Sequence, residues 1–259
     1  MRKRLSIIGA FLIVVGLAFV AGAGYSYMRI QDGYDSLQAF SASQDVQLSY
    51  NEDGQLIDRG TTEGADAIMS LLEDEWKYPV VAGDLDPADP LVNTASEYMY
   101  QMATIIYHVG HGTETIVLDQ GQIDAAIESG ALDPDGTYNG VVDTYAGQVI
   151  TPGAYDVDID GRYWTGFDRT DLFDGQAREM AWSGTVHGLV GELGVGTVTH
   201  STLQMGLGLA ALLAGLGLVF LVTGGGLVWA GRGKDVIVPD TVPDSLTTEQ
   251  FGDKAMENA

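Results

Sequence analysis

The sequence predicts a mostly helical α+β domain that is extracytoplasmic and is carried on two transmembrane helices. Three observations lead to this fold class. Residues 203–230 contain no charged side chain, and residues 5–24 form a second apolar run behind a basic start. The 178 residues between the two runs are enough for one domain with its own core, and they contain 30 Asp and Glu against six Lys and Arg.

The C-terminal apolar run has the length and composition of a membrane span. About 20 apolar residues cross the hydrocarbon core of a bilayer, and this run has 28. Because lipid offers no hydrogen-bond partners to the backbone, a spanning segment of this kind is helical. The sequence therefore predicts a transmembrane helix over residues 203–230.

The N-terminal apolar run allows two interpretations. Its basic residues 2–4 and the small residues 21–23 resemble the start and the cleavage site of a secretory signal. The apolar core of such a signal usually has about 7–15 residues, and this run is longer. We therefore favour an uncleaved transmembrane helix over residues 5–27. Both interpretations place the residues that follow outside the cytoplasm.

Basic residues near the ends of the two runs predict how the chain is threaded. Arg232 and Lys234 follow the second run, and such residues close to a span tend to remain cytoplasmic. We expect a two-pass protein of the plasma membrane, with residues 1–4 and a disordered tail, residues 231–259, in the cytoplasm. Residues 28–202 then form the extracytoplasmic domain.

Small residues in both runs predict close packing of the two spans. They are Ala18, Gly22 and Ser26 in the first run and Ala211, Gly215 and Gly217 in the second. A hairpin of helices within one chain is favoured over a contact between two chains.

The extracytoplasmic segment is predicted to contain five helical stretches. Apolar spacing and capping residues place them at 28–43, from Thr61 or Thr62 to before Pro79, from Asn93 or Thr94 to about Val109, at 120–129 and at 171–195. Alternating apolar residues predict a hairpin within 46–58 and strands at 141–150 and 154–164.

The charge and the absence of cysteine exclude several classes of partner and site. A net charge of −24 repels nucleic acid and attracts cations and basic partners. Without cysteine, the chain has no disulfide, no thiolate nucleophile and no thiolate metal ligand.

Histidines suggest a metal site as one alternative. His108 and His111 lie three residues apart near the end of a predicted helix. A carboxylate from Glu97 or Glu192, together with His187, would give a His and carboxylate set of the kind that binds divalent metals. No HExxH pattern is present, and the favoured interpretation is a pair of histidines with polar partners at a helix end.

The sequence Asp156-Val-Asp158-Ile-Asp160-Gly resembles the first half of a calcium-binding loop. The twelfth position of that loop, where a bidentate Glu is needed, is Phe167. The acidic residues alternate with Val157 and Ile159, which favours an exposed strand that enters a turn.

Three further stretches carry a resemblance to a family. They are residues 49–60 (SYNEDGQLIDRG), 96–104 (SEYMYQMAT) and 181–189 (AWSGTVHGL). The chain resembles uncharacterised two-span envelope membrane proteins of high-GC Gram-positive bacteria, over both spans and most of the intervening segment. Some members are automatically labelled aromatic ring-opening dioxygenases. That activity would imply a metal held by His and carboxylate, for which this sequence has no recognisable ligand motif.

No sequence motif points to a specific reaction. The chain has no G-x-S-x-G nucleophile elbow and no phosphate-binding glycine pattern. We expect a non-enzymatic accessory or interaction module of the cell envelope with no cofactor. Its expected partners are membrane lipid and either another membrane protein or a basic extracytoplasmic protein. The alternative is a metal-dependent enzyme, or a metal or calcium sensor, that uses the histidines and acidic residues named above.

Overall fold

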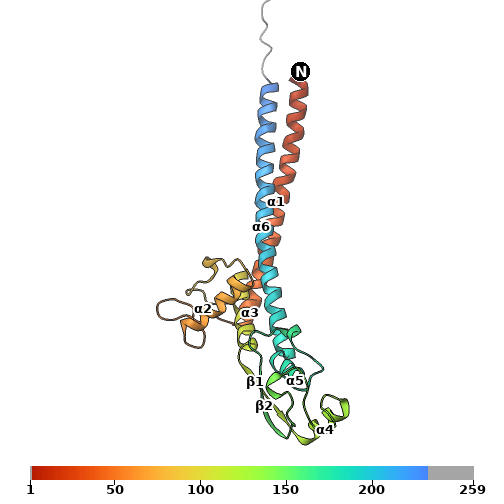
Figure 1. The fold of residues 1–259 in the computed structure, drawn as a ribbon. Coiled ribbons are helices and arrows are strands. Elements are labelled where there is room, and N and C mark those ends of the chain that lie inside the picture. Colours follow the sequence, from red (N-terminus) through yellow and green to blue (C-terminus); the bar gives the residue numbers. More distant parts are fainter. Residues whose placement is uncertain (1, 233–259) are drawn as a thin grey trace, which may run out of the picture. The chain divides into compact units, whose positions relative to one another are not determined.

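The computed structural model describes residues 2–232 and is mostly helical, with one small sheet (Figure 1). The helices are α1 (Arg2–Gln44), α2 (Thr62–Ser70), α3 (Ala95–Gly110), α4 (Gln120–Ser129), α5 (Leu172–Ala181) and α6 (Gly184–Gly231), and the strands are β1 (Thr113–Leu118) and β2 (Gly153–Asp158). The chain divides into two compact units, of which residues 23–212 form one, and the described residues 2–22 and 213–232 form the other. Most of the predicted tail, including Lys234, lies outside the described residues.

Helices α1 and α6 are both long and apolar enough to cross a membrane. Only 11% of the most apolar 18-residue window of each helix is buried, unlike a core helix of a soluble protein. Both predicted spans are therefore confirmed as helices. The predicted extension of the first helix through residues 28–43 is also confirmed, because α1 continues to Gln44.

The smaller unit, formed by residues 2–22 and 213–232, contains two helical segments that meet through glycines. A Cβ placed on Gly9 would lie 2.6 Å from the carbonyl oxygen of Gly224, and one on Gly16 would lie 2.8 Å from that of Gly217. The seven-residue spacing on each helix is that of a left-handed helix pair. Of the six small residues predicted to make this contact, Gly217 is confirmed.

Two predicted contact residues in this unit, Gly22 and Gly215, are wrong, because no atom lies within 4 Å of a Cβ built on either. Ala18 is also wrong as a contact residue, because it is exposed. The small-residue pattern indicated that the helices pack closely but did not determine which side of each helix makes the contact. The side of each helix that makes the contact is the one on which Gly9 approaches Gly224 and Gly16 approaches Gly217.

The sheet of the larger unit is an antiparallel pair in which Thr113 faces Asp158 and Leu118 faces Gly153. The inward side chains Ile116, Leu118 and Val157 are at most 1% exposed. The prediction of a strand at 154–164 is thus confirmed only as far as Asp158.

The predicted strand at 141–150 is wrong. Its middle forms a short 3-10 turn at Asp143–Tyr145, and Gly147 has a φ of +78°. A left-handed residue at this position turns the backbone out of an extended path. Thr137 and Val149 still form one isolated antiparallel bridge across this segment.

An aromatic cluster attaches α5 to the sheet and the adjoining loop. Phe173 is fully buried, and its ring centroid lies 4.9 Å from those of Tyr138, Tyr145 and Tyr155. Tilted and edge-on ring pairs at this spacing are favourable beyond the area that they bury. The Tyr138 hydroxyl also donates a 2.7 Å hydrogen bond to Asp171, the N-cap residue of α5.

The hairpin predicted within 46–58 is confirmed in a minimal form, because residues 49–51 and 55–57 pair antiparallel but neither arm forms a regular strand. A single bridge joins Tyr50 and Leu56 across Gly54, whose φ is +76°. The Thr61 side chain then accepts a hydrogen bond from the Gly64 N–H and caps α2, as predicted. Helix α2 continues into a π-helical turn, η1 (Leu71–Glu75), and so ends before Pro79.

Helices α3 and α4 begin as predicted, each with a reciprocal capping box. Thr94 and Glu97 exchange hydrogen bonds at α3, and Asp119 and Gln122 do so at α4. The single predicted helix at 171–195 is two helices, because α5 ends at Ala181 and α6 begins at Gly184.

His200 of α6 is held in its neutral form at the start of α3. It is 6% exposed, its Nδ1 accepts a 3.1 Å hydrogen bond from the Ala95 N–H, and its ring lies edge-on to Tyr34. Burial lowers the pKa of His200, although the carboxylate of Asp84 acts in the opposite direction. A protonated Nδ1 would have no lone pair for the Ala95 N–H and would place positive charge at a helix N-terminus.

We expect His200 to make the domain less stable as the pH falls. Its pKa is lower in the folded state than in the unfolded chain, so the unfolded chain binds the proton more readily below about pH 6.5. The stability is fully present above that value and declines as the pH drops toward the folded-state pKa. The measurement is the free energy of unfolding of the wild type minus that of His200→Asn, between pH 7.5 and 5. A difference that does not change over this range would contradict the prediction.

Candidate functional site

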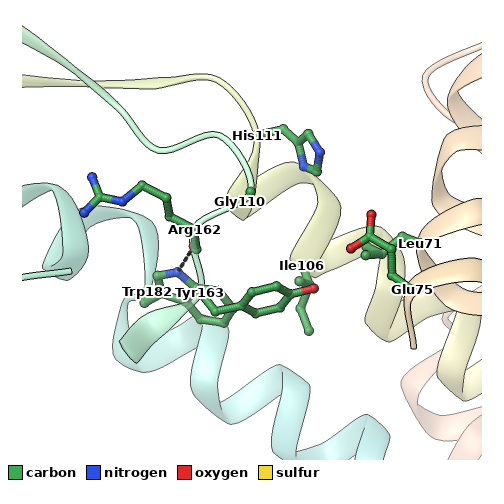
Figure 2. A pocket seen from close by; sticks show the side chains of 9 residues that line it. Leu71, Glu75, Ile106, Gly110, His111, Arg162, Tyr163 and Trp182 are labelled. Atoms are coloured by element: carbon green, nitrogen blue, oxygen red, sulfur yellow. Dashed lines mark hydrogen bonds between the residues drawn. The ribbon is translucent and has the colours of Figure 1, made fainter. Parts of the chain in front are cut away.

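A small pocket lies where the C-terminal end of α3 meets the π-helical turn η1 and the loop after β2 (Figure 2). Its volume is about 60 Å³. The lining residues are Leu71, Glu75, Ile106, Gly110, His111, Gly161, Arg162, Tyr163 and Trp182. A π-helical turn inside a helix is often found at a functional site.

Two aromatic rings form one side of this pocket. The ring centroids of Tyr163 and Trp182 are 6.1 Å apart. The Tyr163 hydroxyl accepts a 2.8 Å hydrogen bond from Trp76 Nε1, and Trp182 Nε1 donates a 3.2 Å bond to the Arg162 carbonyl oxygen. In Figure 2 the Tyr163 hydroxyl points toward the side that carries Leu71 and Glu75. These bonds hold both rings in place.

His111 lines the pocket, and its neutral form has a lone pair on Nε2. Its Nδ1 lies 2.8 Å from the carbonyl oxygen of Tyr107, which can only accept, so Nδ1 carries the proton. The imidazole ring also lies against the Tyr107 ring, with centroids 4.2 Å apart. The remaining nitrogen, Nε2, is 4.0 Å from a carboxylate oxygen of Asp160.

The charges around the pocket are negative on balance. Glu75 is exposed and makes no ion pair among the described residues. The Arg162 guanidinium points away from the pocket in Figure 2 and lies 2.7 Å from the buried carboxylate of Asp174. It also donates a 2.9 Å hydrogen bond to the Gly166 carbonyl oxygen. The lining arginine is therefore engaged elsewhere and does not neutralise Glu75.

The histidines considered as metal ligands have separate partners. His108 Nε2 lies 2.9 Å from Asp58 Oδ1, whereas His111 bonds to its own helix. His187 Nδ1 lies 3.0 Å from the Ser183 carbonyl oxygen, and its ring is edge-on to Trp164. In the structure, His108 and His111 are a pair of helix-end histidines with polar partners. This arrangement is the favoured interpretation of the sequence.

Glu97 is used within the capping box of α3. It is 1% exposed, and its Oε2 accepts hydrogen bonds from the N–H groups of Asn93 and Thr94 and from the Thr94 hydroxyl. Burial has the largest effect and raises the pKa of Glu97. The hydrogen bonds from Asn93 and Thr94 lower this pKa, and the negative charge of Asp89 raises it. All three bonds go to one end of the helix, so they explain why a carboxylate is buried here.

The acidic residues of the calcium-like stretch form a strand and a turn, as favoured from the sequence. Asp156 lies in β2 and accepts a 2.7 Å hydrogen bond from the Thr115 hydroxyl. Asp158 ends the strand and accepts a bond from the Asp160 N–H, which closes the turn. Phe167, at the twelfth loop position, is 7% exposed.

Within residues 2–232, no three His, Asp or Glu side chains gather as they would around a metal ion. Of the seven predicted ligands, only His111 lines this pocket; Asp160 lies 4.0 Å from His111 Nε2 but is not part of the pocket wall, and the others have separate partners. Glu75, Tyr163 and Trp182 were not predicted from the sequence, because no local pattern marks a π-helical turn or the residues that a distant loop places beside it. No family model, no curated protein and no solved structure matches this chain.

Proposed function

We propose that this chain is a two-pass plasma-membrane protein whose domain of residues 28–202 lies outside the cytoplasm. In this proposal the domain is a non-enzymatic interaction module of the cell envelope, and it binds a basic partner protein. Two long apolar helices support attachment to the membrane. Basic residues near Arg2 and at Arg232 support the threading, because such residues tend to remain cytoplasmic.

The excess of negative charge is the observation on which the proposal rests. Residues 25–202 contain 30 Asp and Glu against six Lys and Arg. Within that segment, the described ion pairs with arginine involve Asp32, Asp174 and Glu179. Other carboxylates, such as Asp119 and Asp171, accept hydrogen bonds from backbone N–H groups, which leaves their charge in place. A surface of this kind attracts basic partners and accelerates their association.

The pocket supplies a specific contact site on this negatively charged domain. It is lined by the Glu75 carboxylate, the His111 imidazole and the aromatic rings of Tyr163 and Trp182. A cation is attracted to an aromatic face within about 6 Å, and more strongly when a carboxylate is nearby. We therefore assign the pocket to the charged end of a Lys or Arg side chain of the partner.

We expect hexalysine to bind the full chain in lipid nanodiscs and hexaglutamate not to bind. Replacing Glu75 with Gln should weaken hexalysine binding about fivefold, because the cation in the pocket loses its carboxylate. Binding is measured by calorimetry at low salt, with the signal of empty nanodiscs subtracted. Raising the salt should weaken it further, since exposed charges are screened.

The matched control is Glu128→Gln, which removes the same charge from the exposed face of α4. This variant should change hexalysine binding less than twofold. If hexaglutamate binds as well as hexalysine, the proposed partner class is wrong. If the two glutamine variants weaken binding equally, the pocket is not the site of contact.

A further inference from the structure

A second cavity, of about 210 Å³, lies between the C-terminal end of α1, helix α3 and the first turns of α6. All of its residues belong to the unit formed by residues 23–212. Its walls are mainly apolar and include Val92, Ile105 and Leu193. Phe40 and Leu189, which are 44% and 43% exposed, also line it. The cavity is thus open to solvent and is bordered by apolar side chains.

The hydroxyl groups in the wall of this cavity are already satisfied. Ser41 Oγ donates a 3.0 Å hydrogen bond to the Leu37 carbonyl oxygen, and the Tyr98 hydroxyl lies 2.7 Å from Ser41 Oγ. Because Ser41 uses its proton in the first bond, Tyr98 is the donor in the second. This part of the wall therefore needs no hydrogen bond from a ligand and can contact an alkyl chain.

One charged residue, Glu192, lines the cavity. Among residues 2–232 it forms no described ion pair or hydrogen bond, and no Lys or Arg lines the cavity. Burial raises the pKa of the neighbouring Tyr98, and the negative charges of Glu97 and Glu192 add to this effect. Glu192 is therefore close enough to the cavity wall for its charge to act on a bound group.

We propose that this cavity binds a primary alkylammonium ion, with the alkyl chain against the apolar walls and the ammonium group beside Glu192. The proposal goes beyond the proposed function, because it concerns a small amphiphile at a different site. At about 30 Å³ for each water-sized group, the cavity holds about seven such groups. Hexylammonium, with seven non-hydrogen atoms, has the matching size.

The test compares hexylammonium, hexanoate and hexanol as probes of the full chain in nanodiscs, by calorimetry against empty nanodiscs. We expect hexylammonium to bind at least tenfold more tightly than hexanoate, with hexanol between them. Glu192→Gln should make the affinities for hexylammonium and hexanol equal. Leu189→Trp, which adds a large ring at an exposed edge of the cavity, should abolish binding of all three.

Glu128→Gln is again the control for loss of one surface charge, and it should leave the order of the three probes unchanged. Binding of hexanoate as tightly as hexylammonium would overturn the proposal, and so would hexylammonium binding that survives Leu189→Trp. Hexalysine binding to Glu192→Gln and Leu189→Trp reports on the proposed function separately. Loss of hexylammonium binding with retained hexalysine binding would support two independent sites.

Discussion

Replacing Phe173 with Ala is expected to lower the free energy of unfolding of the larger unit by about 3–5 kcal/mol. The side chain is fully buried and contacts three tyrosine rings, so its removal leaves a cavity that the fixed rings cannot fill. Helix α5 is joined to the sheet through this cluster. The measurement is denaturant unfolding in nanodiscs, followed by the near-ultraviolet circular dichroism of the aromatic side chains.

The same substitution at Phe40, which is 44% exposed, provides the control for the change in residue type. Phe40→Ala should cost clearly less, because its ring already contacts solvent in the folded chain. Phe173→Leu should fall between the two, since it retains most of the apolar volume. Equal losses for Phe173→Ala and Phe40→Ala would mean that the cluster does not hold α5 to the sheet.

The helices were predictable where a local signal fixes their ends. Helix α4 was predicted at its observed bounds, because Ile123 and Ile127 give the apolar spacing and the helix stops at Gly130, which has a φ of +80°. The start of α3 was marked in the same way by Thr94. Capping involves residues three or four positions apart, so a single sequence contains the whole signal.

Strand β1 and the pocket could not be predicted in this way. Residues 113–118 alternate in burial only because β2, 35 or more residues later, pairs with them. The pocket similarly requires Glu75 and Tyr163, which are 88 positions apart in the chain. Histidine is a common ligand, which is why the sequence points to His111, whereas its local bond to Tyr107 shows which ring nitrogen carries the proton.

Replacing Gly217 with Leu is expected to separate the two helical segments of the smaller unit. A Cβ at this position would lie 2.9 Å from the Gly16 carbonyl oxygen and 2.7 Å from a methyl carbon of Val20, so the backbones must move apart. In lipid, close packing of this kind is a main source of helix association, because no hydrophobic effect acts between the helices. The loss should therefore be large relative to the total packing energy of the pair.

Cysteine cross-linking measures this separation directly, because the natural chain has no cysteine. Phe19 and Phe220, whose ring centroids are 5.7 Å apart, are both replaced with Cys and treated with a short bifunctional maleimide. We expect efficient cross-linking in the otherwise unchanged chain and at least a severalfold loss with Gly217→Leu.

Gly215→Leu is the matched control, since it makes the same change two residues away, where no atom lies within 4 Å of the new Cβ. It should leave the cross-linking yield unchanged, because its side chain extends away from the helix contact. A loss with Gly215→Leu equal to that with Gly217→Leu would show that added bulk anywhere on this helix disturbs it. An unchanged yield with Gly217→Leu would show that the glycine contact does not hold the pair together. Only a loss confined to Gly217→Leu supports a contact made by backbone approach at Gly16 and Gly217.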